Sequence, residues 1–306
     1  MKTIARLGHW RTGLAAGALT AGFLLAGWSM LFAHQGKDSI LHIGSSGSLT
    51  SSSNVKEEDA LETLRSFIKE ETGMENQIVK EKNWQEVTDK LAKNELQIGV
   101  YQGYEFAWAK DKLPDLKPLM LAVRVHPFSK AFVIANKSNQ ATDFAGLAGQ
   151  TLSIPLASTG FPELFVEREA LAAGKKLDTY FSKVTRPPEA EDAIDDVVDG
   201  VVQATVVDQT VLEAYKRRKP GRFAKLKLVA QSQPFPPAII AYKDKALEEA
   251  ALQRFRDGLI KASAKERGQR MLNMFRLTGF ELPPAEFEKI VSETKQKYPA
   301  PADAPK

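Results

Sequence analysis

The sequence contains no cysteine and few histidines. Without cysteine, the chain has no disulfide framework, no thiolate zinc site, no cysteine nucleophile and no lipidated cysteine anchor. Two of the four histidines, His9 and His34, lie in or beside an apolar N-terminal stretch, which leaves His42 and His126 for the remaining chain. The sequence also lacks an HExxH, GxSxG or phosphate-loop signature. These absences argue against an enzyme, and we expect no cofactor and no metal site.

The chain also lacks a strong excess of either charge. Its formal net charge of +4 comes from 42 basic and 38 acidic residues. Residues 1–36 contain Lys2, Arg6 and Arg11 and no acid, which leaves 39 basic against 38 acidic residues, or +1, in the remainder. No basic stripe with interleaved aromatic residues stands out. Nucleic acid is therefore not an expected partner.

Residues 1–36 have the pattern of an export signal. A short basic segment ends at Arg11 and is followed by an uncharged apolar run of 22 residues, Thr12 to Ala33. A helix of that length, at about 1.5 Å per residue, could also span a bilayer. The sequence leaves open a cleaved signal peptide and a retained membrane anchor. Both would place the rest of the chain in the periplasm or another extracytoplasmic space.

Strand and helix patterns alternate through the rest of the chain. In the first half, the candidate strands are residues 39–44, 76–80 and 96–101, and the candidate helices between them are 56–72 and 84–94. A second alternating set follows, with strands at 152–155, 181–185 and 203–207 and helices at 162–173, 192–198 and 209–217. This rhythm predicts an α/β protein built of βαβ units, with a mainly parallel sheet in each half.

Two strand-rich crossings, near residues 126–131 and 233–238, predict two lobes joined by two strands. The cleft between such lobes is a natural ligand site. The expected division is a first part of lobe 1 at 37–128, lobe 2 at 129–235, a return to lobe 1 with C-terminal helices at 236–298, and a disordered tail at 299–306.

One short stretch, "LSIPLASTGFPELF" at residues 152–165, places hydroxyl groups and a glycine where a strand gives way to a helix. Ser158 and Thr159 follow the strand, Gly160 lets a ligand approach the backbone, and Pro162 suits the first helical turn. The free N–H groups and the dipole at a helix start attract an oxyanion. Serine, threonine and glycine also cap helices whatever binds there, and both interpretations stay open.

Four segments in order resemble a known family. They are Asp143–Ile154, Ala157–Phe161, Asp199–Asp208 and Gln231–Ile240. Together they resemble the phosphate/phosphite/phosphonate-binding proteins of bacterial ABC importers, over about residues 41–290. The resemblance implies the two-lobed, type II-like periplasmic binding protein fold. It also implies an extracytoplasmic component of an ABC importer that closes its lobes over a small oxyanion such as phosphonate, phosphite or phosphate.

The resemblance also suggests binding residues. In lobe 1 it implies that Trp84 and Tyr101 face the cleft, although Trp84 could instead be a half-buried helix aromatic and Tyr101 a core aromatic. In lobe 2 it implies that Asp208 accepts a hydrogen bond from a monoprotonated phosphonate or from a ligand amine, unless it only caps the next helix. Ala190 and Glu191 stand where relatives have a His-Glu pair. Glu191 could bind an amine or a protonated oxygen, or it could be only an acid favoured by the dipole at its helix start. Ser46, in a serine-rich loop, could donate a hydrogen bond from its hydroxyl, or the loop could be only a flexible polar segment.

Closure is expected to bury the anion against neutral N–H and O–H donors, with an ABC permease in the membrane as partner and the protein a monomer. An alternative function keeps the same fold. A protein held in the membrane by residues 12–33 would sense a diverged ligand and signal to a partner protein. An intact Met1 in the mature protein would favour this sensory module. An enzyme on this fold is least favoured, because cysteine is absent and histidine is scarce.

Overall fold

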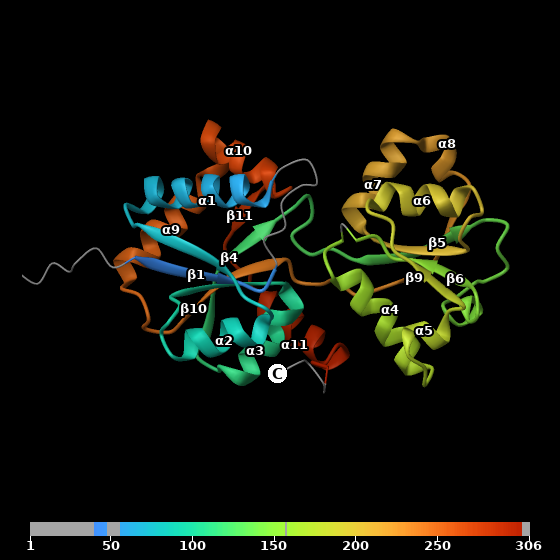
Figure 1. Cartoon of the computed structure of the whole chain (residues 1–306), viewed down its shortest axis with the longest axis horizontal. Helices are drawn as coiled ribbons and strands as arrows, with labels where there is room; N and C mark the ends of the chain where they lie inside the picture. Colours follow the sequence, from blue (N-terminus) through green and yellow to red (C-terminus); the bar gives the residue numbers. More distant parts are fainter. Residues whose placement is uncertain (1–39, 48–55, 157, 302–306) are drawn as a thin grey trace, which may run out of the picture. The chain divides into compact units, whose positions relative to one another are not determined.

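The computed structural model describes residues 40–47, 56–156 and 158–301. The predicted leader and most of the serine-rich loop lie outside this part of the chain, as do Ala157 and the last residues of the predicted tail. The described residues form an α/β fold with two separate sheets, each with helices on both faces (Figure 1). We call the part around the six-stranded sheet lobe 1 and the part around the five-stranded sheet lobe 2.

Lobe 1 is built on a sheet of strand order β11-β4-β10-β3-β1-β2. Its strands are β1 (Leu41–Ser45), β2 (Asn76–Lys80), β3 (Ile98–Tyr101), β4 (Leu116–Val123), β10 (Ala238–Lys243) and β11 (Gly279–Glu281). The β1–β2 and β1–β3 pairs are parallel, whereas the pairs of β10 with β3 and β4 and of β11 with β4 are antiparallel. The sheet is therefore mixed and not mainly parallel, because β4 and β10 lead into and out of the other lobe.

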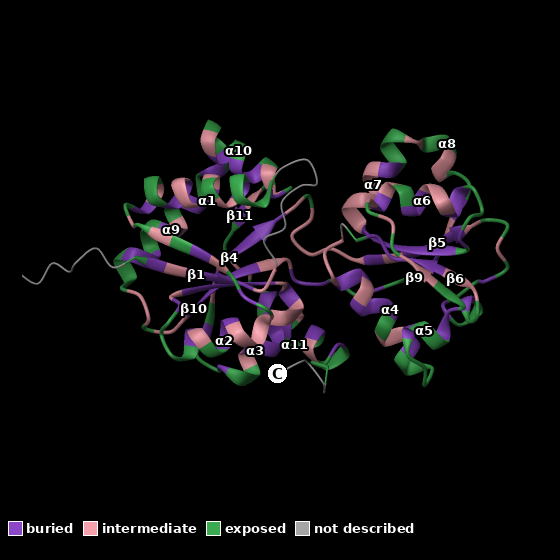
Figure 2. Cartoon of the chain, viewed as in Figure 1, coloured by how far each residue is buried: buried purple, intermediate pink, exposed green. Residues whose placement is uncertain are grey.

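Helices cover both faces of this sheet (Figure 1). They are α1 (Glu57–Thr72), α2 (Trp84–Ala92), α3 (Gly103–Lys112), α9 (Glu249–Ile260), α10 (Glu266–Met274) and α11 (Phe287–Lys297). One face packs against α1, α9 and α10, and the other against α2, α3 and α11. Strand alternation separates the two cores: Ile98 and Val100 face the first helix layer, and Tyr101 faces the second. The strands are accordingly mostly buried (Figure 2).

Lobe 2 has a sheet of order β7-β6-β8-β5-β9. Its strands are β5 (Ala131–Asn136), β6 (Thr151–Ser153), β7 (Lys183–Thr185), β8 (Ala204–Asp208) and β9 (Leu226–Gln231). Its helices are α4 (Phe161–Ala172), α5 (Leu177–Tyr180), α6 (Ala190–Val198), α7 (Gln209–Arg218) and α8 (Pro220–Phe223). This sheet is also mixed, since β6 pairs in parallel with β7 and β8 but β5 is antiparallel to its neighbours. A short 3-10 turn lies at Ala145–Leu147 in lobe 2, and another lies at Ala262–Ala264 in lobe 1.

Two segments connect the lobes, one between β4 and β5 and one between β9 and β10. They meet at an antiparallel bridge between Ser129 and Phe235, where the Phe235 N–H donates to the Ser129 carbonyl at 2.8 Å. Nearby, the Ala131 N–H donates to the Ser232 hydroxyl at 2.9 Å. The structure thus has the two predicted connections, close together, while the exact lobe boundaries stay predictions.

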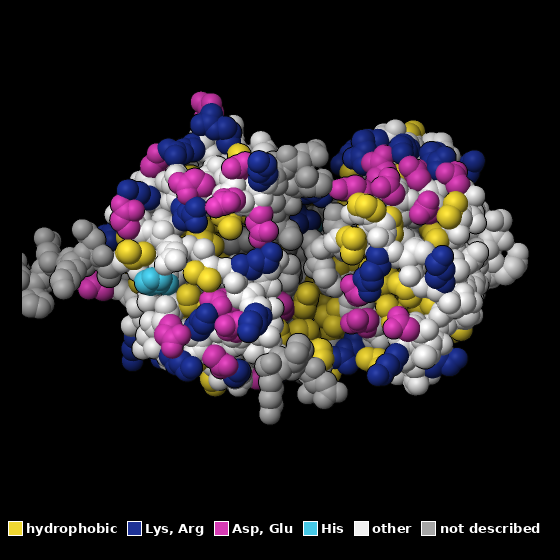
Figure 3. Space-filling view, viewed as in Figure 1, with side chains coloured by type: hydrophobic (Ala, Val, Ile, Leu, Met, Phe, Trp, Pro, Cys, Tyr) yellow, Lys and Arg dark blue, Asp and Glu magenta, His cyan; other side chains and the backbone are white. Residues whose placement is uncertain are grey.

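The surface carries charges of both signs. Figure 3 shows Lys and Arg side chains interspersed with Asp and Glu over the face in view. This mixture agrees with the near-zero net charge of the chain beyond residue 36. Within the described residues, no helix combines the length and apolar character needed to cross a membrane.

Candidate functional site

A pocket lies where the connecting segments meet both lobes. Its polar lining residues are Gln102 at the start of α3, Arg124, His126 and Ser129 on the first connection, Thr159 before α4, and Asp208 and Thr210 at the start of α7. Gln102 directly follows β3 and Asp208 is the last residue of β8, and the ends of strands are where open α/β sheets place their ligands. The pocket therefore gathers polar groups from segments that are far apart in the sequence.

Arg124 brings a positive charge into this pocket. It directly follows β4, and its backbone carbonyl accepts a 2.6 Å hydrogen bond from the Thr278 hydroxyl. Among the described residues, its guanidinium has no hydrogen bond and no ion pair within 4.0 Å. Burial lowers the pKa of Arg124, partly opposed by the attraction of Asp208. The side chain is half-buried, and a partly desolvated charge without a close partner favours an anion beside it.

Two hydroxyl groups in the same pocket also lack partners. The side-chain oxygens of Ser129 and Thr159 are buried and have no hydrogen-bond partner among the described residues. Buried polar atoms in native structures are nearly always hydrogen-bonded, and an unmet one often marks a ligand or water site. Together with Arg124, these hydroxyls supply donors for an oxyanion.

Asp208 has a structural role and lies in the pocket as well. One carboxylate oxygen accepts a hydrogen bond from the Val211 N–H at 2.9 Å, which caps α7. The residue is 6% exposed and lines the pocket. The cap that the sequence left as an alternative is thus present. It occupies one oxygen, and the carboxylate keeps further acceptor capacity for a ligand.

The predicted turn of Ser158, Thr159 and Gly160 does precede a helix, with Gly160 as the N-cap residue of α4. Gly160 has φ 70°, and a Cβ there would lie 2.5 Å from the Tyr104 hydroxyl of α3. The Phe161 N–H already donates to the Thr159 carbonyl at 2.7 Å, and the next residue, a proline, has no N–H. The helix start therefore offers fewer free amides than predicted, and Thr159 supplies a hydroxyl instead.

Two predicted site residues lie elsewhere. Tyr101 is fully buried, and its hydroxyl lies 3.1 Å from that of Thr88 in the core of lobe 1. Burial raises the pKa of Tyr101. Period-2 alternation turns its ring toward α2 and α3, away from the pocket, so it matches the core interpretation.

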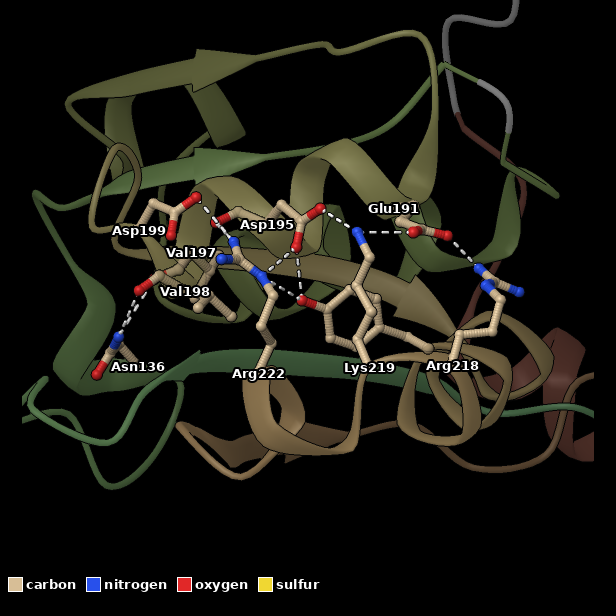
Figure 4. Close-up of polar contacts among 10 residues, drawn as sticks. Asn136, Glu191, Asp195, Val197, Val198, Asp199, Arg218, Lys219 and Arg222 are labelled. Carbon is tan, nitrogen blue, oxygen red and sulfur yellow. Dashed lines mark hydrogen bonds and ion pairs between the residues drawn. The ribbon is translucent and has the colours of Figure 1, made fainter.

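Glu191 instead belongs to an ion-pair network on α6 to α8 (Figure 4). It pairs with Arg218 and Lys219, and hydrogen bonds from Lys219 and then Arg218 lower its pKa. Asp195 joins the same network through Lys219 and Arg222. With its carboxylate engaged by these cations, Glu191 does not line the pocket.

The remaining two predicted residues lie outside the pocket lining. The indole of Trp84 packs against Trp108, with ring centroids 5.8 Å apart. The Ser46 hydroxyl donates to the Glu105 carboxylate, which also accepts from the Gln102 N–H at 2.9 Å. Burial raises the pKa of Glu105 to about 6, against the effect of these hydrogen bonds. Of the predicted residues, Thr159 and Asp208 line the pocket, and Ser158 and Gly160 adjoin Thr159 in the chain.

Sequence reasoning missed Arg124, Ser129, Gln102 and Thr210. Arg124 left one signal, which is a charged residue directly after a long apolar strand pattern. That signal could not identify a ligand site, because Arg124 becomes part of a pocket only together with residues of the other lobe, such as Asp208.

The chain was compared with known families and structures. A model of the family described as "ABC transporter, phosphonate, periplasmic substrate-binding protein" matches residues 47–286. No curated protein matches the sequence.

Among solved structures, a Xanthomonas citri protein bound to ATP is 14% identical, with a TM-score of 0.63, and the alignment covers 85% of this chain and 97% of that one. PhnD1 from Prochlorococcus marinus in complex with methylphosphonate is 15% identical, with a TM-score of 0.57 and coverage of 85% and 98%. A binding protein component of an ABC phosphonate transporter from Pseudomonas aeruginosa is 14% identical, with a TM-score of 0.53 and coverage of 88% and 91%. At these identities the likeness shows the fold.

Proposed function

The chain belongs to the periplasmic substrate-binding proteins of phosphonate ABC transporters, and we propose that it binds a small oxyanion such as phosphonate, phosphite or phosphate in the pocket at Arg124. Membership confirms the resemblance read from the sequence. It makes the protein a transport component, with a small-molecule ligand, an ABC permease as partner and an extracytoplasmic location. The choice of ligand is our proposal.

The observation that carries the proposal is the unpaired guanidinium of Arg124 beside the unpartnered hydroxyls of Ser129 and Thr159. An oxyanion would accept hydrogen bonds from all three groups at once. Hydrogen bonds from a charged donor are roughly twice as strong as neutral ones. The sequence predicted neutral donors, and Arg124 adds a charge that we expect to supply much of the affinity.

Asp208 restricts the kind of oxyanion. A carboxylate repels a second full negative charge at short range, and the cost grows as water is excluded. A phosphonate or phosphate that keeps one proton can donate a hydrogen bond from that O–H group to Asp208 instead of being repelled. The fold of PhnD1, solved with methylphosphonate, gives independent support for a ligand of this class.

Transport follows from the two-lobed fold. Closure about the paired connections would bring Thr159 and Asp208 of lobe 2 against Arg124 and seal the anion from water. Docking on the permease would then reopen the lobes and release the ligand.

The direct test is calorimetric titration of the purified protein with phosphate, phosphite, methylphosphonate and 2-aminoethylphosphonate. We expect saturable binding of at least one of them and a matching rise in melting temperature. Absence of binding by all four would overturn the proposal.

A further inference from the structure

The two lobes touch beside the pocket, where the start of α3 meets the start of α4. A Cβ atom at Gly160, the N-cap residue of α4, would lie 2.5 Å from the hydroxyl oxygen of Tyr104 on α3. Real Cβ atoms essentially never come within 3.0 Å of a neighbour. The tyrosine hydroxyl of lobe 1 therefore fills the place that a side chain at residue 160 of lobe 2 would take.

Tyr104 is held in place on two sides. The preceding residue, Gly103, begins α3, and a Cβ there would lie 2.1 Å from the backbone carbonyl oxygen of Pro236 on the second connection. The Tyr104 ring packs edge-on against Trp108, with ring centroids 5.0 Å apart, and Trp108 is 7% exposed. With its helix start against backbone and its ring against a buried indole, the tyrosine has little room to yield. A side chain at residue 160 would therefore push the lobes apart.

This contact is one residue away from a group of the anion site. Thr159 directly precedes Gly160, and its unpartnered hydroxyl lines the pocket together with Arg124. The Phe161 N–H donates to the Thr159 carbonyl at 2.7 Å, with Gly160 at φ 70° and ψ −42° between them. So tight a turn has little slack. A displacement of Gly160 is therefore passed on to Thr159.

We propose that Tyr104 and Gly160 are positioning residues of the anion site, whose contact stops lobe closure where Thr159 reaches an oxyanion held at Arg124. The inference rests on the proposed function and adds the residues that set the width of its site. A Cβ at residue 160 would have to retreat from 2.5 Å to the 3.4 Å of an ordinary contact. A hydrogen bond of about 2.8 Å that is lengthened by this amount is lost.

The backbone at Gly160 gives a second reason for glycine, and the two reasons have different consequences. A φ of 70° is unfavourable for a residue with a Cβ, whatever lies nearby. That strain lies within one turn of lobe 2 and is the same in the free and the bound protein, so it lowers stability and leaves affinity unchanged. A steric stop between the lobes acts on the closed state, so its disturbance lowers affinity.

The test is a double-mutant cycle measured by calorimetric titration with the four anions named above. Gly160→Ala should weaken binding by about tenfold or more, because a hydrogen bond to a charged ligand is lost. In the Tyr104→Phe background the hydroxyl is gone, and the nearest remaining ring atom would lie 3.5 Å from the new Cβ. The loss caused by Gly160→Ala should there shrink to about threefold or less. Equal losses in both backgrounds would overturn the inference and leave the proposed function standing.

Gly149→Ala is the matched control. Gly149 also belongs to lobe 2 and has φ 76°, but a Cβ there would meet nothing within 4 Å. This variant should be less stable and bind with unmodified affinity, whereas a loss as large as that of Gly160→Ala would also overturn the inference. Should Gly160→Ala not fold, recovery of folding in the double variant would support the clash, and its failure to fold would contradict it. Absence of binding of all four anions by the unmodified protein would reject the proposed function, and this inference with it.

Discussion

The indole N–H of Trp108 donates a hydrogen bond to the backbone carbonyl of Tyr298 at 2.6 Å. Trp108 belongs to α3 of lobe 1, and Tyr298 directly follows α11 of the same lobe. The Tyr298 ring, however, packs on Phe235 of the second connection, with ring centroids 4.6 Å apart. Phe235 in turn stacks on Phe161 at the start of α4 in lobe 2. The end of the described chain thus forms a third link between the lobes.

Replacement of Tyr298 tests this link in two steps. Its ring is 2% exposed, and its hydroxyl is buried without a partner in the described part of the chain. Tyr298→Phe should keep the packing and remove an unmet polar group, so stability should stay equal or rise by about 1 kcal/mol. Tyr298→Ala should lower it by about 3–5 kcal/mol. Urea unfolding measures both, and a larger loss for phenylalanine than for alanine would contradict the assignment.

Arg124→Gln should have opposite effects on stability and on binding. The guanidinium is a half-buried cation, and its charge is disfavoured by desolvation and by the nearby Arg276, so its removal should raise the melting temperature without ligand. Loss of a charge-assisted hydrogen bond should weaken oxyanion affinity by about tenfold or more. Arg254→Gln, at an exposed site on α9, is the matched control and should change neither. If Arg124→Gln lowered stability and left affinity intact, the arginine would be structural.

Asp208→Asn should change how affinity depends on ligand protonation. Asparagine caps helices as well as aspartate does, so the bond from Val211 and the start of α7 should persist. In the unmodified protein, methylphosphonate should bind less tightly as pH rises and the ligand loses its last proton. The variant should lose this pH dependence and gain relative affinity for methanesulfonate, which carries no proton. Calorimetry at several pH values measures both, and identical pH profiles would exclude a role for Asp208 in ligand choice.

The features predicted best from the sequence are those that depend on residues nearby in the chain, such as helix caps and strand ends. Asparagine directly before a helix pattern is a typical cap, and the Asn83 side chain accepts from the Glu86 N–H at 2.9 Å. Tyr101 was correctly placed at the end of a strand, but the face that it occupies depends on how β3 packs between two helix layers. Glu191 lies in the first turn of its helix as expected, whereas its partners Arg218 and Lys219 lie on α7 and just after it. Contacts between residues so far apart in the sequence cannot be predicted from a local sequence pattern.

The same limit applies to the pocket. Thr159 and Asp208 were predicted because each follows a strand and precedes a helix, which is a local feature. Arg124 needed the alignment of β4 with β10 and the approach of lobe 2 before it could be seen as an anion site. Composition and spacing therefore predicted the fold and two of the pocket residues, and tertiary packing determined the charge in the pocket.

Glu105 should make stability fall as pH rises through its own titration. Burial raises its pKa from 4.5 to about 6, so the folded state holds a proton that the unfolded state releases between these values. Its contribution is most favourable below about pH 4.5 and is lost above about pH 6, at about 1–2 kcal/mol. Glu105→Gln keeps an oxygen to accept from Ser46 and the Gln102 N–H but cannot ionise.

The variant should therefore be more stable than the unmodified protein at pH 7.5 by about that amount, 1–2 kcal/mol, and the gain should shrink toward pH 4.5. Urea unfolding across this range measures the difference, and Glu95→Gln, at an exposed position, should show no such trend. A stability difference that grows as pH falls would have the wrong sign for a carboxyl group whose pKa is raised by burial. It would mean that the hydrogen bonds from Ser46 and Gln102 outweigh the desolvation of Glu105.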